Sequence, residues 1–327
     1  MRLAFIGGFG HHYLRAAITD PSCGIDQPVA IAGDGHDNSR AHSFAATIPG
    51  ARWYTDALDM FDQFRPHAVS IGSVYGFNSD LAALALERDI PVVSDKPIAA
   101  NWDQFHRLQT LTRDPRRVIV TEFDFRCRPE FIAARQAVAA GLLGDIALAV
   151  AQKSYRFNTR PDWYKDRRSY SGTLMWIASH GVDVIPFTTG HRFRRVTGVQ
   201  GNLSRPELGS FEDHCVVVFQ LDNGGSAVVH ADFLRPAKAA SHGDDRLRLA
   251  GTKGVLEVRD DRCRLTTHDQ PEKDITDMGV TKPLHVELLA ALEGRSERYG
   301  TASSMETAEI LLHTRDALDT ATFLDFR

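Results

Sequence analysis

The strongest constraint on the fold is the order of short apolar runs in residues 1–121. Runs rich in β-branched residues alternate with segments of helical periodicity. Repeated strand–helix units build a parallel sheet, because each helix carries the chain back to the start of the next strand. We therefore predict a doubly wound parallel sheet with strands at 2–6, 28–32, 52–55, 68–72, 91–95 and 118–125. Helices are expected over 11–18, 38–47, 78–88 and from about Asn101 onward.

The pattern changes after about Val118. Segments 213–221 and 226–234 alternate apolar and polar residues on either side of Asn223-Gly224-Gly225, which is a strong hairpin signal. Residues 246–258 continue this alternation, and two helices close the chain. Ser303 and Glu306 have the capping-box spacing and are expected to open the last helix. The second half thus predicts an α+β domain with a large, mostly antiparallel open sheet.

The length of 327 residues favours two domains over one, because single hydrophobic cores stop growing near this size. From the change in topology we expect a dinucleotide-binding Rossmann domain over 1–121. Residues 122–327 are expected to form a substrate-binding and oligomerisation domain.

Charge and cysteine content exclude several classes of partner. A net charge of -4 without basic runs disfavours nucleic acid and anionic membrane surfaces. The short N-terminal apolar run is no signal peptide or membrane span, so a cytoplasmic protein is expected. The four cysteines lack metal-ligand spacing, and we expect neither a disulfide nor a bound metal.

Three glycines after the first strand predict a nucleotide site. Gly7, Gly8 and Gly10 precede a predicted helix, whose backbone amides could donate to a pyrophosphate. If Gly8 and Gly10 begin the G-x-G-x-x-G fingerprint, its third glycine is replaced by Tyr13. Asp34, after the second strand, could accept from ribose hydroxyls, which favours NAD. The nearby Arg40 leaves NADP open.

Several short motifs in a fixed order resemble the Gfo/Idh/MocA family, which includes glucose-fructose oxidoreductase and inositol dehydrogenase. The first is Asp95-Lys96-Pro97, where the family has Glu-Lys-Pro. The others are Arg126-Cys127-Arg128-Pro129, Ser171-Gly172-Thr173-Leu174, His180-x-x-Asp183, Glu212-Asp213 and Gly251-Thr252-Lys253-Gly254. The resemblance covers nearly the whole chain. It implies oxidation or reduction of a sugar, polyol or related alcohol, in a homodimer or homotetramer.

The resemblance also suggests roles for individual residues. Lys96 is expected to bind the substrate oxygen and to contact the cofactor, with His180 as the acid–base group. Asp183 lies three residues after His180 on a helical pattern and is expected to support the imidazole. Ser73 and Asn78, after the fourth strand, are expected to contact the cofactor.

One position departs from the family. Where relatives commonly have an aspartate, four residues before the histidine, this chain has Trp176, which cannot accept a proton. Trp176 is interpreted either as a stacking surface for a sugar or as a packing residue. Glu122 and Asp124 are candidates to replace the missing carboxylate.

An aromatic and cationic stretch precedes the histidine helix. Tyr155, Arg160 and Trp163 suit a loop that closes over a hydroxylated or anionic substrate, and a subunit contact is the alternative. His11 and His12 are interpreted as surface residues rather than metal ligands, because adjacent helical positions point apart.

Three functions fit these observations. The first is an NAD(P)-dependent dehydrogenase or reductase acting on CH–OH groups of a sugar or polyol. The second is a non-redox member that uses a bound nucleotide for lyase or epimerase chemistry. The third is a catalytically silent nucleotide or sugar sensor. Substrate identity and reaction direction depend on pocket shape, which motifs do not encode.

Overall fold

The computed structural model describes residues 1–326, which divide into two compact units. The first unit contains Met1–Glu122, Arg168–Ser171 and Lys282–Glu309. The second contains Phe123–Arg167, Gly172–Thr281 and the chain from Ile310 onward. The division of domains at residue 121 stays a prediction. The structure adds that two later segments return to the first unit.

The first unit is built on a six-stranded sheet in which every neighbouring pair is parallel. The strand order is β3-β2-β1-β4-β5-β6, which is the order of a Rossmann fold. All strands except the edge strand β3 are fully buried, as expected for a sheet covered on both faces. The strands are β1 (Leu3–Ile6), β2 (Ala30–Ala32), β3 (Arg52–Tyr54), β4 (Ala68–Ile71), β5 (Val92–Ser94) and β6 (Ile119–Thr121).

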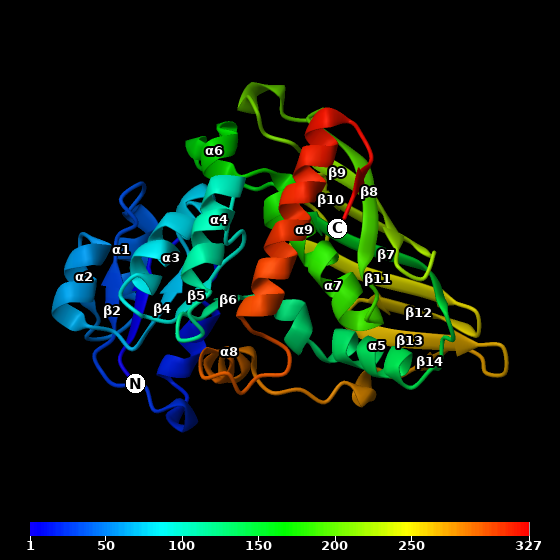
Figure 1. The fold of residues 1–327 in the computed structure, drawn as a ribbon, viewed down its shortest axis with the longest axis horizontal. Coiled ribbons are helices and arrows are strands. Elements are labelled where there is room, and N and C mark those ends of the chain that lie inside the picture. Colours follow the sequence, from blue (N-terminus) through cyan, green and yellow to red (C-terminus); the bar gives the residue numbers. More distant parts are fainter. Residues whose placement is uncertain (327) are drawn as a thin grey trace. The chain divides into compact units, whose positions relative to one another are not determined.

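Helices α1 to α4 lie beside these strands (Figure 1). Asn101 precedes α4 as predicted, and its side chain accepts a hydrogen bond from the Gln104 amide at 2.9 Å. The helix expected over 11–18 is instead a short 3₁₀ helix, η1 (Tyr13–Ile18). The helices are α1 (Ser39–Ala46), α2 (Ala57–Phe64), α3 (Asn78–Leu86), α4 (Trp102–Leu111), α6 (Arg167–Tyr170) and α8 (Leu284–Leu292), with two 3₁₀ turns, η2 (Pro21–Cys23) and η3 (Tyr75–Phe77).

The second unit contains a nine-stranded sheet in the order β14-β13-β12-β11-β7-β10-β9-β8-β15. Only β7 and β10 pair in parallel, so the predicted mostly antiparallel sheet is confirmed. The hairpin at Asn223-Gly224-Gly225 joins β9 to β10. The strands are β7 (Ile146–Tyr155), β8 (Phe193–Gly201), β9 (His214–Leu221), β10 (Ser226–Asp232), β11 (Gly243–Gly251), β12 (Gly254–Arg259), β13 (Arg262–Thr267), β14 (Lys273–Asp274) and β15 (Leu324–Asp325).

Helices α5 (Pro129–Ala139) and α7 (Ser179–Thr189) pack together, and α7 also packs on β7 and β10 (Figure 1). A π-helical turn, η6 (Leu174–Ala178), leads into α7. The 3₁₀ turns are η4 (Asp124–Cys127), η5 (Asp162–Lys165), η7 (Pro206–Leu208) and η8 (Thr276–Met278). The last helix, α9 (Thr301–Thr320), begins before Ser303, whose hydroxyl donates to the Gly300 carbonyl, so the predicted capping box is wrong. No helix of residues 1–326 is long and apolar enough to cross a membrane.

Close packing of α7 on the sheet depends on Gly181. A Cβ at this position would lie 2.6 Å from Cγ1 of Val229 on β10 and 3.3 Å from the Ala151 side chain on β7. The helix therefore approaches the two parallel strands more closely than any larger residue allows.

We expect Gly181→Ala to destabilise the protein by about 1–3 kcal/mol, because the new methyl group overpacks this contact. In a Val229→Ala background the same change should be neutral or stabilising by up to about 1 kcal/mol, since alanine favours helix. Urea unfolding of the two single variants and the double variant measures this coupling. An equal cost in both backgrounds would contradict the packing role of Gly181.

Candidate functional site

The glycine turn after β1 packs tightly on the turn after β4. Gly7 has a φ of 80°, and a Cβ there would lie 2.7 Å from the Gly72 carbonyl oxygen. A Cβ on Gly8 would lie 2.5 Å from the Ala41 nitrogen. The Gly7 amide donates to Ala32 at 3.0 Å, and the Gly10 amide donates to Gly72 at 2.9 Å. The amides of Gly7 and Gly10 thus have acceptors within the protein, and the predicted contact of the following helix with a pyrophosphate stays a prediction.

His12 lies between the glycine turn and β4. Its Nδ1 lies 2.8 Å from the Ser70 hydroxyl, and its Nε2 lies 3.1 Å from the Gly7 carbonyl oxygen. The ring also packs edge-on against Phe5. Burial lowers the pKa of His12 to about 4, so the imidazole is neutral at pH 7. The prediction of a surface histidine is wrong here, because the ring is an internal hydrogen-bonding group.

Asp34 is directed toward the protein rather than toward solvent, with only 5% of its surface exposed. One carboxylate oxygen accepts from the amides of His36 at 2.9 Å and Asp37 at 3.0 Å. The other oxygen accepts from the Val74 amide at 3.1 Å. Asp34 therefore shapes the loop after β2 and ties it to the turn after β4. Arg40 is exposed, and its guanidinium lies 4.7 Å from the centre of the Phe9 ring.

Ser73 and Asn78 form a buried network. The Ser73 amide and hydroxyl both donate to Asn78 Oδ1, at 3.1 and 2.8 Å. The Asn78 amide group donates to the carbonyls of Asp95 at 3.1 Å and Pro97 at 3.4 Å. These two residues thus hold the backbone on both sides of Lys96, which makes them supports of the site. Their predicted contact with a cofactor stays a prediction.

Lys96 lies directly after β5, and only 1% of its surface is exposed. Its Nζ is 2.9 Å from Oδ1 of Asp95 and 3.1 Å from Nδ1 of His11. Asp95 is fully buried, and its Oδ2 also accepts from the His11 amide at 2.8 Å. The ring of His11 is stacked on Tyr13, with 5.2 Å between ring centres. Asp95 and His11 together direct the lysine ammonium.

The carboxyl group of Asp95 is ionised at neutral pH. Burial alone would raise its pKa, but the charge of Lys96 and the hydrogen bonds from Lys96 and His11 bring the pKa well below its usual value. The Asp95 carboxylate thus forms a buried ion pair with Lys96. A Cβ on Gly10 would lie 2.5 Å from Oδ2 of Asp95, so the glycine is needed for this contact.

In the second unit, His180 lies on α7 and is buried. Its Nδ1 is 3.2 Å from Oδ1 of Asp124, which begins η4. The rings of Phe123 and Phe125 pack against the imidazole, at 5.6 and 5.1 Å between ring centres. Asp124, one of the two acids considered as replacements for the missing aspartate, thus lies beside the histidine. Glu122 instead accepts from the Tyr13 amide at 3.4 Å in the first unit.

Asp183 makes a different contact from the one predicted. Its two oxygens accept from Nε and a terminal nitrogen of Arg126, at 2.9 and 2.5 Å. A buried bidentate pair of this kind fixes the relative position of α7 and η4, which carry His180 and Asp124. The predicted support of the His180 imidazole by Asp183 stays a prediction.

Trp176 lies within the π-helical turn η6 and is only 4% exposed. The carbonyl of Trp176 accepts from the Ser179 hydroxyl at 2.9 Å, and its amide donates to Gly172 at 3.0 Å. This burial favours the packing interpretation over a stacking platform. π-Helical turns are frequent at functional sites, and this one determines how α7 begins.

The aromatic and cationic stretch also packs internally. Tyr155 is stacked on His242 at 4.7 Å between ring centres, and Trp163 packs on Tyr164 at 4.7 Å. The guanidinium of Arg160 lies over Tyr164 and over Phe233, at 5.4 and 5.1 Å from the ring centres. These contacts order the loop, and its contact with a substrate or a subunit stays a prediction.

One group of possible metal ligands occurs within residues 1–326. Asp20, Cys23 and His285 place their ligand atoms within 4.8 Å of one another. The Nε2 of His285 is 2.9 Å from Oδ2 of Asp20, which is an ion pair when the histidine is protonated. Burial raises the pKa of the Cys23 thiol, which therefore stays protonated at neutral pH.

Sequence profiles of known families match both halves of the chain. The oxidoreductase family with an NAD-binding Rossmann fold, GFO/IDH/MocA, matches residues 1–123. The GFO/IDH/MocA C-terminal domain matches residues 131–257. The chain belongs to the Gfo/Idh/MocA family.

Individual relatives agree with this assignment. The chain is 25% identical to inositol 2-dehydrogenase of Arthrobacter sp. (strain FB24), over 67% of this chain and 65% of that protein. It is 24% identical to D-glucoside 3-dehydrogenase of Escherichia coli K12, over 60% of each. The chain thus matches less than two thirds of the length of these curated relatives. A candidate oxidoreductase from Thermotoga maritima has the same fold, with a TM-score of 0.91, 28% identity and full coverage of both chains.

The first unit is therefore the NAD-binding domain of a Gfo/Idh/MocA protein. Its strand order provides the crevice at the β1–β4 switch point where dinucleotides bind in such sheets. Gly7, Gly8 and Gly10 are required by close packing of this turn, because a Cβ at each would lie within 2.7 Å of other atoms of the protein. The exposed Arg40 is a cation at this end of the sheet. The sequence placed Asp95 in the Asp95-Lys96-Pro97 motif and His11 on the surface, but it did not predict that both residues bind the lysine ammonium.

The lowered pKa of His12 predicts a dependence of stability on pH. An unfolded histidine binds a proton below its ordinary pKa of 6.5, whereas the folded one stays neutral down to about 4. The unfolded state therefore binds more protons in this window, and stability falls as the pH drops from 6.5 toward 4. We expect the melting temperature of His12→Gln to fall less steeply over this range than that of the wild type. Parallel slopes for the two proteins would contradict the prediction.

Proposed function

We propose that this chain is an NAD-dependent dehydrogenase or reductase acting on a CH–OH group of a sugar or polyol. The observation that carries the proposal is the buried Lys96 ammonium, held by Asp95 and His11 at the carboxyl end of β5. Open α/β sheets bind their ligands at this end of the strands. A buried cation there suits the oxygen of a carbinol, which becomes more negative as its proton leaves.

The second unit supplies a group for the proton. Bound NAD would supply the acceptor for the hydride that leaves the carbinol carbon. His180 accepts the hydroxyl proton, and Asp124, 3.2 Å away, stabilises the resulting imidazolium. Asp183 acts as a positioning residue, because its contact with Arg126 fixes the elements that carry His180 and Asp124. Asp124 thus takes the part of the carboxylate that Trp176 cannot supply.

The relatives support the substrate class. One is named for the oxidation of inositol and another for the oxidation of a D-glucoside, so both act on ring-shaped polyhydroxylated molecules. Cyclic polyols and pyranosides are accordingly the first substrates to test.

The proposed function is tested by titrating the protein with NADH and NADPH while following nicotinamide fluorescence. We expect saturable binding of NADH, and reduction of NAD in the presence of an inositol or a glucoside. Binding without turnover across a broad polyol panel would favour a sensor. The absence of binding of either nucleotide would rule out the dehydrogenase.

Variants of the two central residues separate binding from chemistry. Lys96→Met and His180→Gln should each lower kcat by about 10²–10⁴-fold, the range typical of positioned acid–base and electrostatic groups. NADH should still bind to His180→Gln with unchanged affinity, because His180 lies outside the NAD-binding domain. A His180→Gln variant with wild-type kcat would exclude it as the acid–base group.

His11 is a further positioning residue for this reaction. Its Nδ1 accepts from the Lys96 ammonium, and an asparagine can place an amide oxygen near the same point. We expect His11→Leu to lower kcat by about 10–100-fold, the cost of one charged hydrogen bond, and His11→Asn to recover most of it. The melting temperature and NADH affinity should differ little between the two variants. Equal activity of His11→Asn and His11→Leu would exclude the hydrogen-bonding role.

A further inference from the structure

A second feature of the C-terminal unit lies outside the reaction proposed above. A pocket of about 390 Å³ is lined by three arginines, Arg156, Arg205 and Arg235, and by two neutral polar residues, Asn158 and Ser204. The rest of its lining is apolar, and no carboxylate belongs to it. We call it the arginine pocket.

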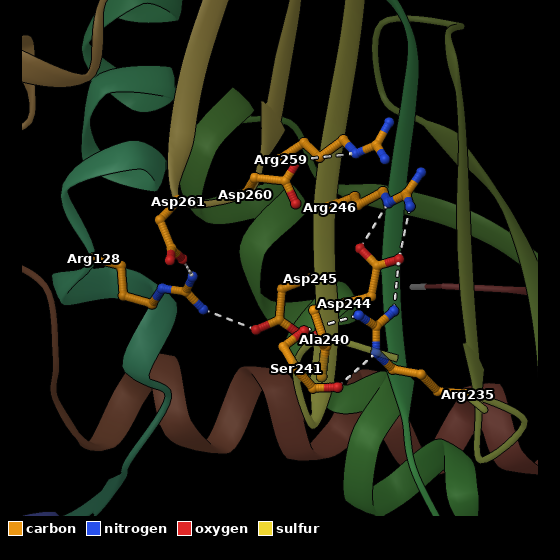
Figure 2. A pocket seen from close by; sticks show the side chains of 11 residues that line it. Arg128, Arg235, Ala240, Ser241, Asp244, Asp245, Arg246, Arg259, Asp260 and Asp261 are labelled. Carbon is orange, nitrogen blue, oxygen red and sulfur yellow. Dashed lines mark hydrogen bonds and ion pairs between the residues drawn. The ribbon is translucent and has the colours of Figure 1, made fainter. Parts of the chain in front are cut away.

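In a neighbouring pocket on the same sheet, arginines are paired with aspartates. This second pocket, of about 460 Å³, contains four arginines and four aspartates (Figure 2). Arg128 contacts Asp245 at 2.8 Å, and Arg259 contacts Asp260 at 3.3 Å. Figure 2 also shows Arg246 and Arg235 directed toward one carboxylate, that of Asp244. Its positive charge is compensated from within the chain.

The arginine pocket lacks this compensation. Within residues 1–326, no carboxylate lies within 4 Å of the guanidinium groups of Arg156 or Arg205. Arg156 donates to the carbonyl of Ala239, and its buried Nε has no hydrogen-bond partner in the described chain. Arg205 rests on the ring of Phe157, at 4.5 Å from the ring centre. Two of the three guanidinium groups therefore carry charge that no acidic side chain neutralises.

The surroundings add positive charge to the pocket. His242 lies near it, and its pKa is lowered by burial and then by the charges of Arg160, Arg156 and Lys153. A guanidinium group offers only donors, so its partners must be acceptors. The Ala239 carbonyl is one such acceptor, and with no acid in the lining the remaining donors of Arg156 and Arg205 are available to acceptors from outside the chain. The planar donor fork of an arginine matches a pair of oxygens on a phosphate or carboxylate group.

We propose that the arginine pocket binds a small molecule bearing a phosphate or carboxylate group. Arg156 and Arg205 hold the anionic oxygens, and Asn158 and Ser204 add neutral hydrogen bonds. Phe157 and Leu234, which is half exposed, cover the uncharged part of the molecule. The site requires neither bound nucleotide nor turnover, so it stands apart from the proposed dehydrogenase reaction.

Calorimetric titration with inorganic phosphate and with malonate, at pH 8 and constant ionic strength, tests the proposal. We expect saturable binding of at least one anion to the wild type. Arg205→Met should weaken it at least tenfold while keeping much of the contact with Phe157. Arg259→Met is the matched control, because it removes a paired arginine from the neighbouring pocket, and it should leave the affinity unchanged.

The outcomes separate the ligand classes and the alternatives. Stronger binding of phosphate indicates a phosphorylated ligand, and stronger binding of malonate indicates a polycarboxylate. Phosphate bound at the glycine turn would be insensitive to Arg205→Met, and that result overturns the proposal. So does the absence of saturable binding in the wild type. A third outcome is that the wild type binds no anion, while sedimentation shows that Arg205→Met no longer forms the oligomer of the wild type. That outcome would assign the pocket to a subunit contact instead.

Discussion

The arrangement of the N-terminal unit depends on one buried carboxylate, that of Asp95. It accepts a hydrogen bond from the backbone amide of His11, in the turn after β1, and it forms an ion pair with the Lys96 ammonium after β5. One negative charge thus determines both the shape of a nucleotide-binding turn and the position of a catalytic candidate. Removing it would leave an uncompensated buried cation, which costs far more than the loss of one hydrogen bond. Position 10 must be a glycine for the same reason, since a side chain there would collide with the Asp95 carboxylate.

The C-terminal unit also contains a buried ion pair, but there the central group is a cation, the Arg126 guanidinium. The Arg126 guanidinium is held by Asp183, and this pair links the two elements that bring His180 to Asp124. Ion pairs in both units therefore act as positioning devices around a functional side chain. The arginine pocket differs, because two of its arginines, Arg156 and Arg205, have no acidic partner in the described part of the chain. Guanidinium groups without an acidic partner in the chain are available to an anionic ligand.

Much of the fold could be predicted from the sequence, because its signals are local. Continuous apolar runs predicted the buried parallel strands, period-two alternation predicted β9 and β10, and Asn101 marked the start of α4. Hydrogen bonds across long sequence separations could not be predicted in this way. The contact of Lys96 with His11 joins residues 85 positions apart, and no local pattern encodes it. Likewise, no local pattern predicted that Arg126, 57 positions away, binds Asp183.

The return of residues 282–309 to the first unit bears on how the protein is made. Helix α8 packs on η1, β5 and β6, and the hydroxyl of Ser304 accepts from the backbone of β6 at 2.9 Å. A ribosome adds residues in order, so the N-terminal sheet is complete in sequence long before these covering segments exist. Until then, one edge of its buried core faces water or a chaperone. The nucleotide domain is thus the first to begin folding and among the last to finish.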